Sequence, residues 1–250
     1  MTTPALPVLI PDWTPPPGVR SLVTTRQGGC SVGPYASLNL GIAVGDAPER
    51  VADNRARLQA LLPAAPSWLR QVHGARVVNA ALAGLLEEAD ASFTTARGVV
   101  CIVQMADCLP VLFSGADGSV VAAAHAGWRG LAAGVLERTI EAMGAPPSSV
   151  LAWLGPAIGP RHFEVGDDVR EAFTAANPMA TRHFEPGARG KWKADLFALA
   201  RQRLAAAGIT RISGGGECTF SDDRRFFSHR RDGVSGRMAA MVWIDPAGRA

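Results

Sequence analysis

Apolar residues of the chain gather into short runs, and the spacing within each run predicts the element that it forms. Runs that are rich in β-branched and other apolar residues and bounded by turn residues are typical of strands. They predict strands at residues 19–25, 68–78, 99–105, 109–113, 120–124, 150–154 and 237–244.

Helical spacing predicts four longer segments, at residues 46–62, 131–143, 167–176 and 194–207. In the second, Leu131, Val135 and Ile140 share one face, and Gly144 ends the helix. Strands and helices alternate irregularly, without an internal repeat or a domain boundary. We therefore predict one α+β or α/β domain, residues 19–250, in which a mixed β-sheet is layered with helices, preceded by an irregular lead-in at residues 1–18.

Composition narrows the class of protein. The chain has 250 residues, of which 48% are hydrophobic and 19% charged, as in a soluble globular protein. Its net charge of +3 is mild and shows no clustered basic face, so we expect no nucleic-acid partner. No apolar run reaches the ~18 residues of a membrane helix, and the proline-rich start does not resemble a secretory signal, so we expect a cytoplasmic location and no membrane contact.

The cysteines exclude several kinds of site. There are four cysteines and five histidines, too few cysteines for a disulfide scaffold and none in a C-x-x-C pair. Zinc ribbons and thioredoxin-type redox motifs are therefore excluded. Chemistry that uses sulfur or imidazole must combine residues that are far apart in the sequence.

Three segments place a reactive side chain where an apolar strand gives way to a turn. They are Gln-Val-His-Gly at 71–74, Ala-Asp-Cys-Leu-Pro at 106–110 and Ala-His-Ala-Gly-Trp-Arg-Gly at 124–130. Two histidines and one thiolate suit zinc with an open position for water, whose pKa the metal would lower towards ~7. The spacing alone does not distinguish such a site from core histidines and a small buried cysteine.

The same three segments, in this order, resemble those of the YfiH-type family, long labelled polyphenol oxidase or laccase-domain proteins and associated with purine nucleoside phosphorylase activity. The resemblance extends over residues 20–245. It also includes Thr-Thr-Arg at 24–26, Tyr-Ala-Ser-Leu-Asn-Leu-Gly at 35–41, Gly-Pro-Ala-Ile-Gly at 155–159 and Phe-Ser-His-Arg-Arg-Asp-Gly at 227–233. The chain departs from the family pattern at His229, where tyrosine is usual, and at Met105, where threonine is common.

This resemblance implies a zinc site made of His73, Cys108 and His125, with copper as the alternative metal. It implies phosphorolysis of adenosine, inosine, guanosine and S-methyl-5'-thioadenosine, with adenosine deaminase as a further activity. The expected fold is similar to that of the bacterial necrotizing factors. The expected partners are purine nucleosides and phosphate, for a monomer or small homo-oligomer.

Further roles follow if the resemblance holds. Asp107 is the candidate for proton transfer. Arg129 and Arg26 are candidates for the phosphate site, since a guanidinium matches phosphate geometry. Asn39 and Gln71 are candidates for binding ribose or base. For each residue the alternative is a purely structural hydrogen bond.

Three other functions remain open. Cys108 and His125 could form the nucleophile and base of a metal-free amide hydrolase or deamidase. The family's older label suggests a copper-dependent phenol oxidase, although a multicopper cluster needs more imidazoles than this chain offers. A partner-binding protein with a structural zinc is the non-enzymatic alternative.

Overall fold

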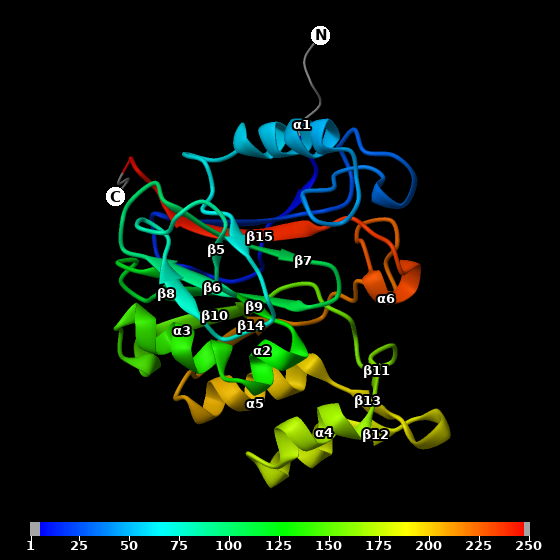
Figure 1. Ribbon diagram of the computed structural model, residues 1–250. Helices are drawn as coiled ribbons and strands as arrows, with labels where there is room; N and C mark the ends of the chain where they lie inside the picture. Colours follow the sequence, from blue (N-terminus) through cyan, green and yellow to red (C-terminus); the bar gives the residue numbers. More distant parts are fainter. Residues whose placement is uncertain (1–5, 248–250) are drawn as a thin grey trace.

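Two β-sheets stack face to face, and helices cover the outer face of each, as the layers in Figure 1 show. The computed structural model describes residues 6–247. The first sheet is antiparallel and has the strand order β1 (Val8–Leu9), β2 (Val19–Thr24), β15 (Met238–Ile244) and β7 (Val100–Met105). The chain therefore brings strands from its beginning, middle and end into one sheet.

The second sheet is mixed. Its order is β14 (Arg211–Gly214), β10 (Val150–Leu154), β8 (Leu109–Gly115), β9 (Val121–Ala126), β6 (Ala91–Thr94) and β4 (Val77–Asn79). The outer pairs β14–β10 and β6–β4 are parallel, and the pairs between them are antiparallel. Three of its predicted strands, β8, β9 and β10, form the centre.

Alternate residues of each central strand face different layers, because successive side chains of a strand point to opposite faces. In β7, Val103 and Met105 pack between the two sheets, whereas Val100 and Ile102 pack with Leu58 of helix α1 (Pro48–Gln59). Both faces are buried, which explains why these strands read as continuous apolar runs instead of an apolar–polar alternation.

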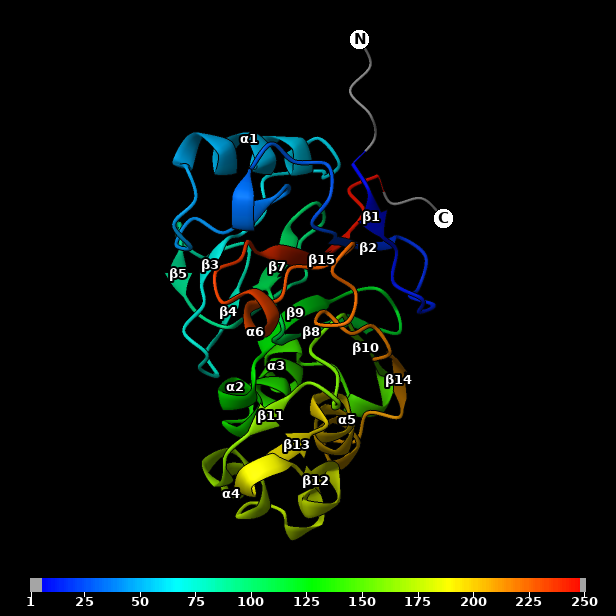
Figure 2. The same cartoon turned by 90° about the vertical axis from the view of Figure 1, so that its right-hand side faces the viewer.

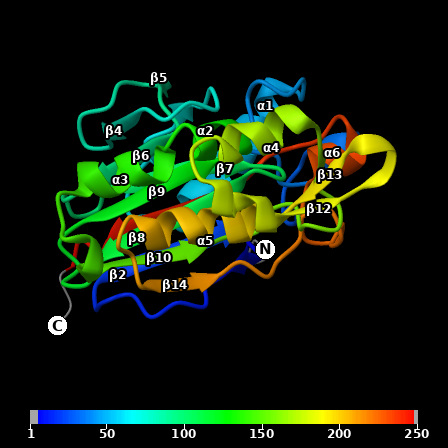
Figure 3. The same cartoon turned by 90° about the horizontal axis from the view of Figure 1, so that it is seen from below.

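Helices α2 (Trp128–Ala132), α3 (Val135–Met143) and α5 (Leu196–Ala206) cover the other face of the second sheet, as seen from below in Figure 3. Beyond them, α4 (Asp167–Thr174) lies against a small antiparallel sheet of β11 (Glu164–Val165), β13 (Trp192–Ala194) and β12 (Phe184–Pro186), at the bottom of Figure 2. Two further short elements flank the site described below: the parallel pair β3 (Leu69–Arg70) and β5 (Glu87–Glu88), and helix α6 (His229–Asp232).

The mixed α+β arrangement is confirmed, but the strands form two stacked sheets and smaller ones instead of a single mixed sheet. The helix predicted at 131–143 is divided, because Gly134 adopts a left-handed conformation with φ of +89°. The strand predicted at 68–78 is interrupted by a loop between β3 and β4. The lead-in contains the short strand β1, and its residues 1–5, like residues 248–250, lie outside the described part of the chain.

None of the helices within residues 6–247 combines the length and the apolarity that a membrane crossing requires.

Removal of a side chain between the sheets should destabilise the whole domain. Leu112 of β8 is fully buried in the layer between the two sheets. We expect Leu112→Ala to lower the free energy of unfolding by about 2–5 kcal/mol, because it removes apolar contacts and leaves a cavity. Leu82, which is 82% exposed, is the control. Its replacement by alanine should change stability by less than about 0.5 kcal/mol in the same urea titration.

Candidate metal centre

Three separate segments bring His73, Cys108 and His125 together. Cys108 occupies the turn between β7 and β8, and His125 lies near the end of β9, opposite Pro110 of β8. His73 comes from the loop that follows β3. Because β8 and β9 are antiparallel neighbours, the start of one strand and the end of the other meet at the same edge of the sheet.

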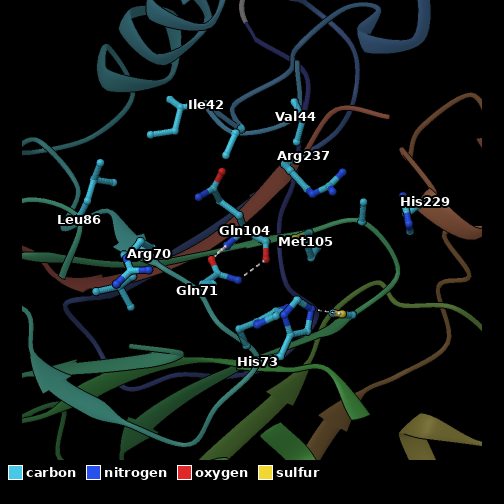
Figure 4. A pocket seen from close by; sticks show the side chains of 16 residues that line it. Ile42, Val44, Arg70, Gln71, His73, Leu86, Gln104, Met105, His229 and Arg237 are labelled. Carbon is cyan, nitrogen blue, oxygen red and sulfur yellow. Dashed lines mark hydrogen bonds between the residues drawn. The ribbon is translucent and has the colours of Figure 1, made fainter. Parts of the chain in front are cut away.

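The three side chains offer one ligand atom each, and these atoms lie within 4.8 Å of one another. His73 Nε2 is 3.7 Å from Cys108 Sγ, and the two imidazole rings are edge to face with centroids 4.9 Å apart (Figure 4). His73 is exposed, Cys108 is half-buried and His125 is buried. The group is therefore anchored on one side and open to the solvent on the other.

Two glycines of the segment at 124–130 allow this close approach. A Cβ atom on Gly127 would lie 2.9 Å from Cys108 Sγ and 3.0 Å from His73 Cδ2. A Cβ atom on Gly130 would lie 2.6 Å from the carbonyl oxygen of Gly74. Only residues without a side chain fit these positions while the ligand segments stay in place.

Asp90 holds the centre together. This carboxylate is fully buried and accepts a hydrogen bond of 2.9 Å from His125 Nδ1. It also accepts the backbone N–H groups of Val72, His73 and Gly74, at 3.1, 2.9 and 2.7 Å. Metal-binding histidines usually donate their second ring N–H to such a carboxylate. The bond to Nδ1 fixes the imidazole so that Nε2 is free to bind a metal.

The pKa of Asp90 reflects these contacts. Burial by itself favours the neutral acid, but the hydrogen bond and charge of His125 and the N–H donors of Gly74 and Val72 outweigh it, so the pKa lies below its ordinary value. Asp90 is therefore an anion at neutral pH and acts only as an acceptor. Sequence reasoning missed this residue, because a single aspartate before an apolar strand carries no distinctive pattern.

Cys108 and His125 stabilise each other's charged forms. Burial opposes ionisation of the thiol, but the charges and hydrogen bonds of His125 and His73 lower the pKa of Cys108 to about 6. Burial likewise opposes protonation of His125, but the Cys108 thiolate and Asp90 raise the pKa of His125 to about 9. A thiolate, the form that binds metals, is therefore present at neutral pH.

One ligand, His73, and a neighbour of another ligand, Asp107, adopt left-handed backbone conformations that are unusual for non-glycine residues. His73 has φ of 61° and Asp107 has φ of 85°. The Asp107 carboxylate accepts hydrogen bonds from Thr219 Oγ1 at 2.6 Å and from the backbone N–H of Arg230 at 2.7 Å. These contacts fix the turn that presents Cys108, and such conformations are typical of functional sites.

The centre lies at one end of a cavity of about 500 Å³, shown in Figure 4. One part of its wall is apolar and the other part is polar. The apolar part includes Ile42, Val44, Leu69, Leu86 and Met105, and the polar part includes Gln71, Gln104, His229 and Arg237. A volume of this size, with a few convergent polar groups, is typical of a small-molecule site.

Of the other five predicted site residues, one lines the cavity and four do not. Gln71 lines the cavity, and its side chain exchanges two hydrogen bonds with the backbone of Gln104. Arg26, Asn39, Asp107 and Arg129 are not among the described residues that line it. Their roles in catalysis and substrate binding remain predictions.

The hydrogen bonds of Asp107 are given above, and the other three residues lie in structural positions. Arg26 lies over the ring of Phe227 and donates to the carbonyl oxygen of Ala36. Asn39 is fully buried. Arg129 is exposed at the start of α2, over the ring of Trp128.

Comparison with known proteins gives the family. A family model described as multi-copper polyphenol oxidoreductase laccase matches residues 20–245. The chain belongs to this family. The resemblance to YfiH-type proteins is confirmed by relatives that match nearly the whole chain.

Among these relatives is a purine nucleoside phosphorylase of Pseudomonas aeruginosa, 54% identical over 237 residues, which are 94% of this chain and 98% of that protein. Purine nucleoside phosphorylase YfiH of Escherichia coli K12 is 51% identical over 242 residues, 95% and 98% of the two chains.

Solved structures of the family share the fold. A Neisseria meningitidis protein superposes with a TM-score of 0.92 at 51% identity, over 95% of this chain and 99% of that one. YlmD from Geobacillus stearothermophilus superposes with a TM-score of 0.85 at 32% identity, over 96% and 100%.

The low pKa of Cys108 predicts its reactivity in chelator-treated protein. The thiol ionises as the pH rises through about 6, so alkylation by iodoacetamide should be about tenfold faster at pH 7 than at pH 5 and change little above pH 7. Peptide mass spectrometry measures the rate at each cysteine. Buried Cys101, whose pKa burial raises to about 12, should stay unmodified. A Cys108 rate that keeps rising through pH 8–9 would contradict the thiolate.

Asp90→Asn should weaken metal binding. In the wild-type protein both oxygens of Asp90 accept hydrogen bonds from N–H groups. The N–H₂ group of an asparagine would face some of these donors instead, so His125 would lose its fixed orientation. We expect metal affinity to fall about 10- to 100-fold in a competition titration with a chromophoric chelator. Asp117→Asn, in the exposed turn between β8 and β9, removes a carboxylate away from the centre and should leave the affinity unchanged.

Proposed function

We propose that the protein is a metal-dependent purine nucleoside phosphorylase that acts on adenosine, inosine, guanosine and S-methyl-5'-thioadenosine, with adenosine deaminase as a second activity. The observation that carries this proposal is the open His73–Cys108–His125 group at one end of a cavity large enough for a nucleoside. Relatives that bear the phosphorylase name at 54% and 51% identity support the reaction class.

The donor set fits zinc. Two imidazole nitrogens and one thiolate are ligands that zinc prefers, and three protein ligands leave a position open. Copper would also accept these ligands, and metal analysis of the purified protein distinguishes the two metals. When bound, the metal supplies a Lewis acid at the end of the cavity. Asp90 keeps His125 oriented toward it.

Gln71 is well placed to bind the nucleoside. Its Oε1 accepts the backbone N–H of Gln104 at 2.7 Å, and its Nε2 donates to the carbonyl oxygen of Gln104 at 2.9 Å. Among the described residues each group has no other partner, so the fixed amide offers one donor and one acceptor to a ligand. The apolar part of the wall, with Ile42, Val44 and Leu86, suits the face of a purine or the ribose carbons.

Asp107 acts in this proposal mainly through Cys108. Both of its carboxylate oxygens already accept hydrogen bonds, from Thr219 and Arg230. Those contacts support a positioning role at the turn. Each oxygen keeps a second lone pair, so these contacts leave Asp107 able to take up a proton.

A metal-free hydrolase is the second candidate function. The thiolate of Cys108 beside a protonated His125 is the arrangement that activates a cysteine nucleophile. Chelation separates the two proposals, because a Cys–His hydrolase keeps its activity without metal.

The proposed function predicts phosphate-dependent release of hypoxanthine from inosine and about one zinc per chain in protein purified without chelators. His73→Ala removes one of three ligands, so we expect at least a ~100-fold loss of kcat/KM together with loss of the metal. Chromatography of the products and metal analysis measure both. His183→Ala removes a histidine outside the cavity and should leave both unchanged. Turnover that persists in His73→Ala after chelation would overturn the proposal.

A further inference from the structure

Arg237 is a cation in the wall of the same cavity, and its position follows from strand pairing. It precedes Met238 of β15, which pairs with Met105 of β7. The first sheet therefore places Arg237 beside Ala106, two residues from Cys108 in the sequence. Figure 4 shows its side chain on the cavity wall, above His73.

The backbone of Arg237 is held firmly. Its N–H donates to Asn39 Oδ1 at 2.9 Å, and its carbonyl oxygen accepts the N–H of Leu40 at 3.0 Å. A Cβ atom on Gly41 would lie 2.8 Å from Arg237 Cγ, so the glycine leaves the room that the side chain occupies.

Asn39 has no capacity left for a substrate. Its Oδ1 accepts from Gly41 and Arg237, and its Nδ2 donates to the Gly41 carbonyl oxygen and to Asp46. All four of its hydrogen-bonding positions are thus used. The buried amide, which the sequence suggested as a ligand for ribose or base, instead positions Arg237.

One end of the Arg237 guanidinium is fixed and the other is free. Nη1 donates to the carbonyl oxygens of Ser235 and Gly236, at 2.9 and 3.0 Å. Nε and Nη2 have no hydrogen-bond partner within residues 6–247, and no described carboxylate forms an ion pair with this side chain. A planar pair of N–H donors, supplied by these two nitrogens, is therefore available to a ligand.

A half-buried arginine without a counter-ion is costly, because burial removes water from the charge. Burial lowers the pKa of Arg237, and the charges of Cys108 and Asp107 only partly oppose this effect. An anionic ligand in the cavity would supply the missing counter-charge. A guanidinium edge matches two oxygens of a phosphate.

We propose that Arg237 binds the phosphoryl group of inorganic phosphate, the co-substrate of the phosphorolysis. This inference rests on the proposed function. In the reaction, one phosphate oxygen forms a bond to C1' of the ribose while the C1'–N9 bond breaks and its electron pair leaves with the purine. The proton that hydrogen phosphate gives up balances the proton that the purine gains, so the products are ribose 1-phosphate and the free base.

Arg237→Gln should raise the KM for phosphate about 10- to 100-fold, which is the effect of losing a hydrogen bond to a charged group. The KM for inosine should change less than about threefold. Arg237→Lys should restore part of the affinity, because it keeps the charge but not the planar pair of donors. Arg138→Gln removes an exposed arginine of α3 and is the control, with both constants unchanged. Equal losses toward both substrates would overturn the assignment.

A binding measurement tests Arg237 without catalysis. Calorimetric titration of inorganic phosphate into metal-loaded protein should show weaker binding to Arg237→Gln by the same factor as the KM. Titration with inosine 5'-monophosphate tests the other source of a phosphoryl group, which is a phosphorylated nucleoside substrate. If only the nucleotide loses affinity, the phosphoryl group belongs to the substrate and the co-substrate assignment is overturned.

The two proposals fail in different ways. If the wild-type protein releases no base with phosphate, the proposed function fails, while the titration still tests Arg237. If the wild-type protein phosphorolyses inosine and Arg237→Gln keeps its phosphate KM and affinity, the function stands and the role of Arg237 is overturned.

Discussion

The site depends on one buried carboxylate. Asp90 binds the imidazole of His125 on β9 and three successive backbone N–H groups in the loop that carries His73. An anion buried without such donors would cost several kcal/mol, and the N–H groups would equally lack acceptors without it. The two ligand segments are therefore fixed to each other before any metal binds. This arrangement is preorganisation in the strict sense, since the protein itself sets the ligand geometry.

The stacked sheets provide the frame for this carboxylate. Strands β7 and β9 end, and strands β15 and β8 begin, near the same edge of the two sheets, so the segments that join them converge. Packing on both faces leaves these strands little freedom to shift, because a displacement would disturb two apolar layers at once. A rigid frame and short turns thus place a thiolate, two imidazoles and an arginine around one cavity.

Charge is distributed unevenly around that cavity. Asp90 and the Cys108 thiolate contact the ligand histidines, whereas Arg237 is held by neutral amide and carbonyl groups. Neutral partners orient the guanidinium without neutralising it. The positive charge thus remains available to a ligand, which a carboxylate partner in the same place would have prevented.

The sequence alone determined the elements whose signal is local. Continuous apolar runs gave most central strands, periodicity gave the main helices, and reactive residues at strand ends, with the family resemblance, pointed to His73, Cys108 and His125. Only the tertiary structure decided which strands pair and that residues 71–76 form a loop. It also decided the roles of Asp90 and Arg237. Each of these depends on partners distant in the chain: Asp90 and His125 are 35 residues apart, and Arg237 and Asn39 are 198 apart. Periodicity reports only near neighbours along the chain, whereas a buried charge is defined by whatever the fold places around it.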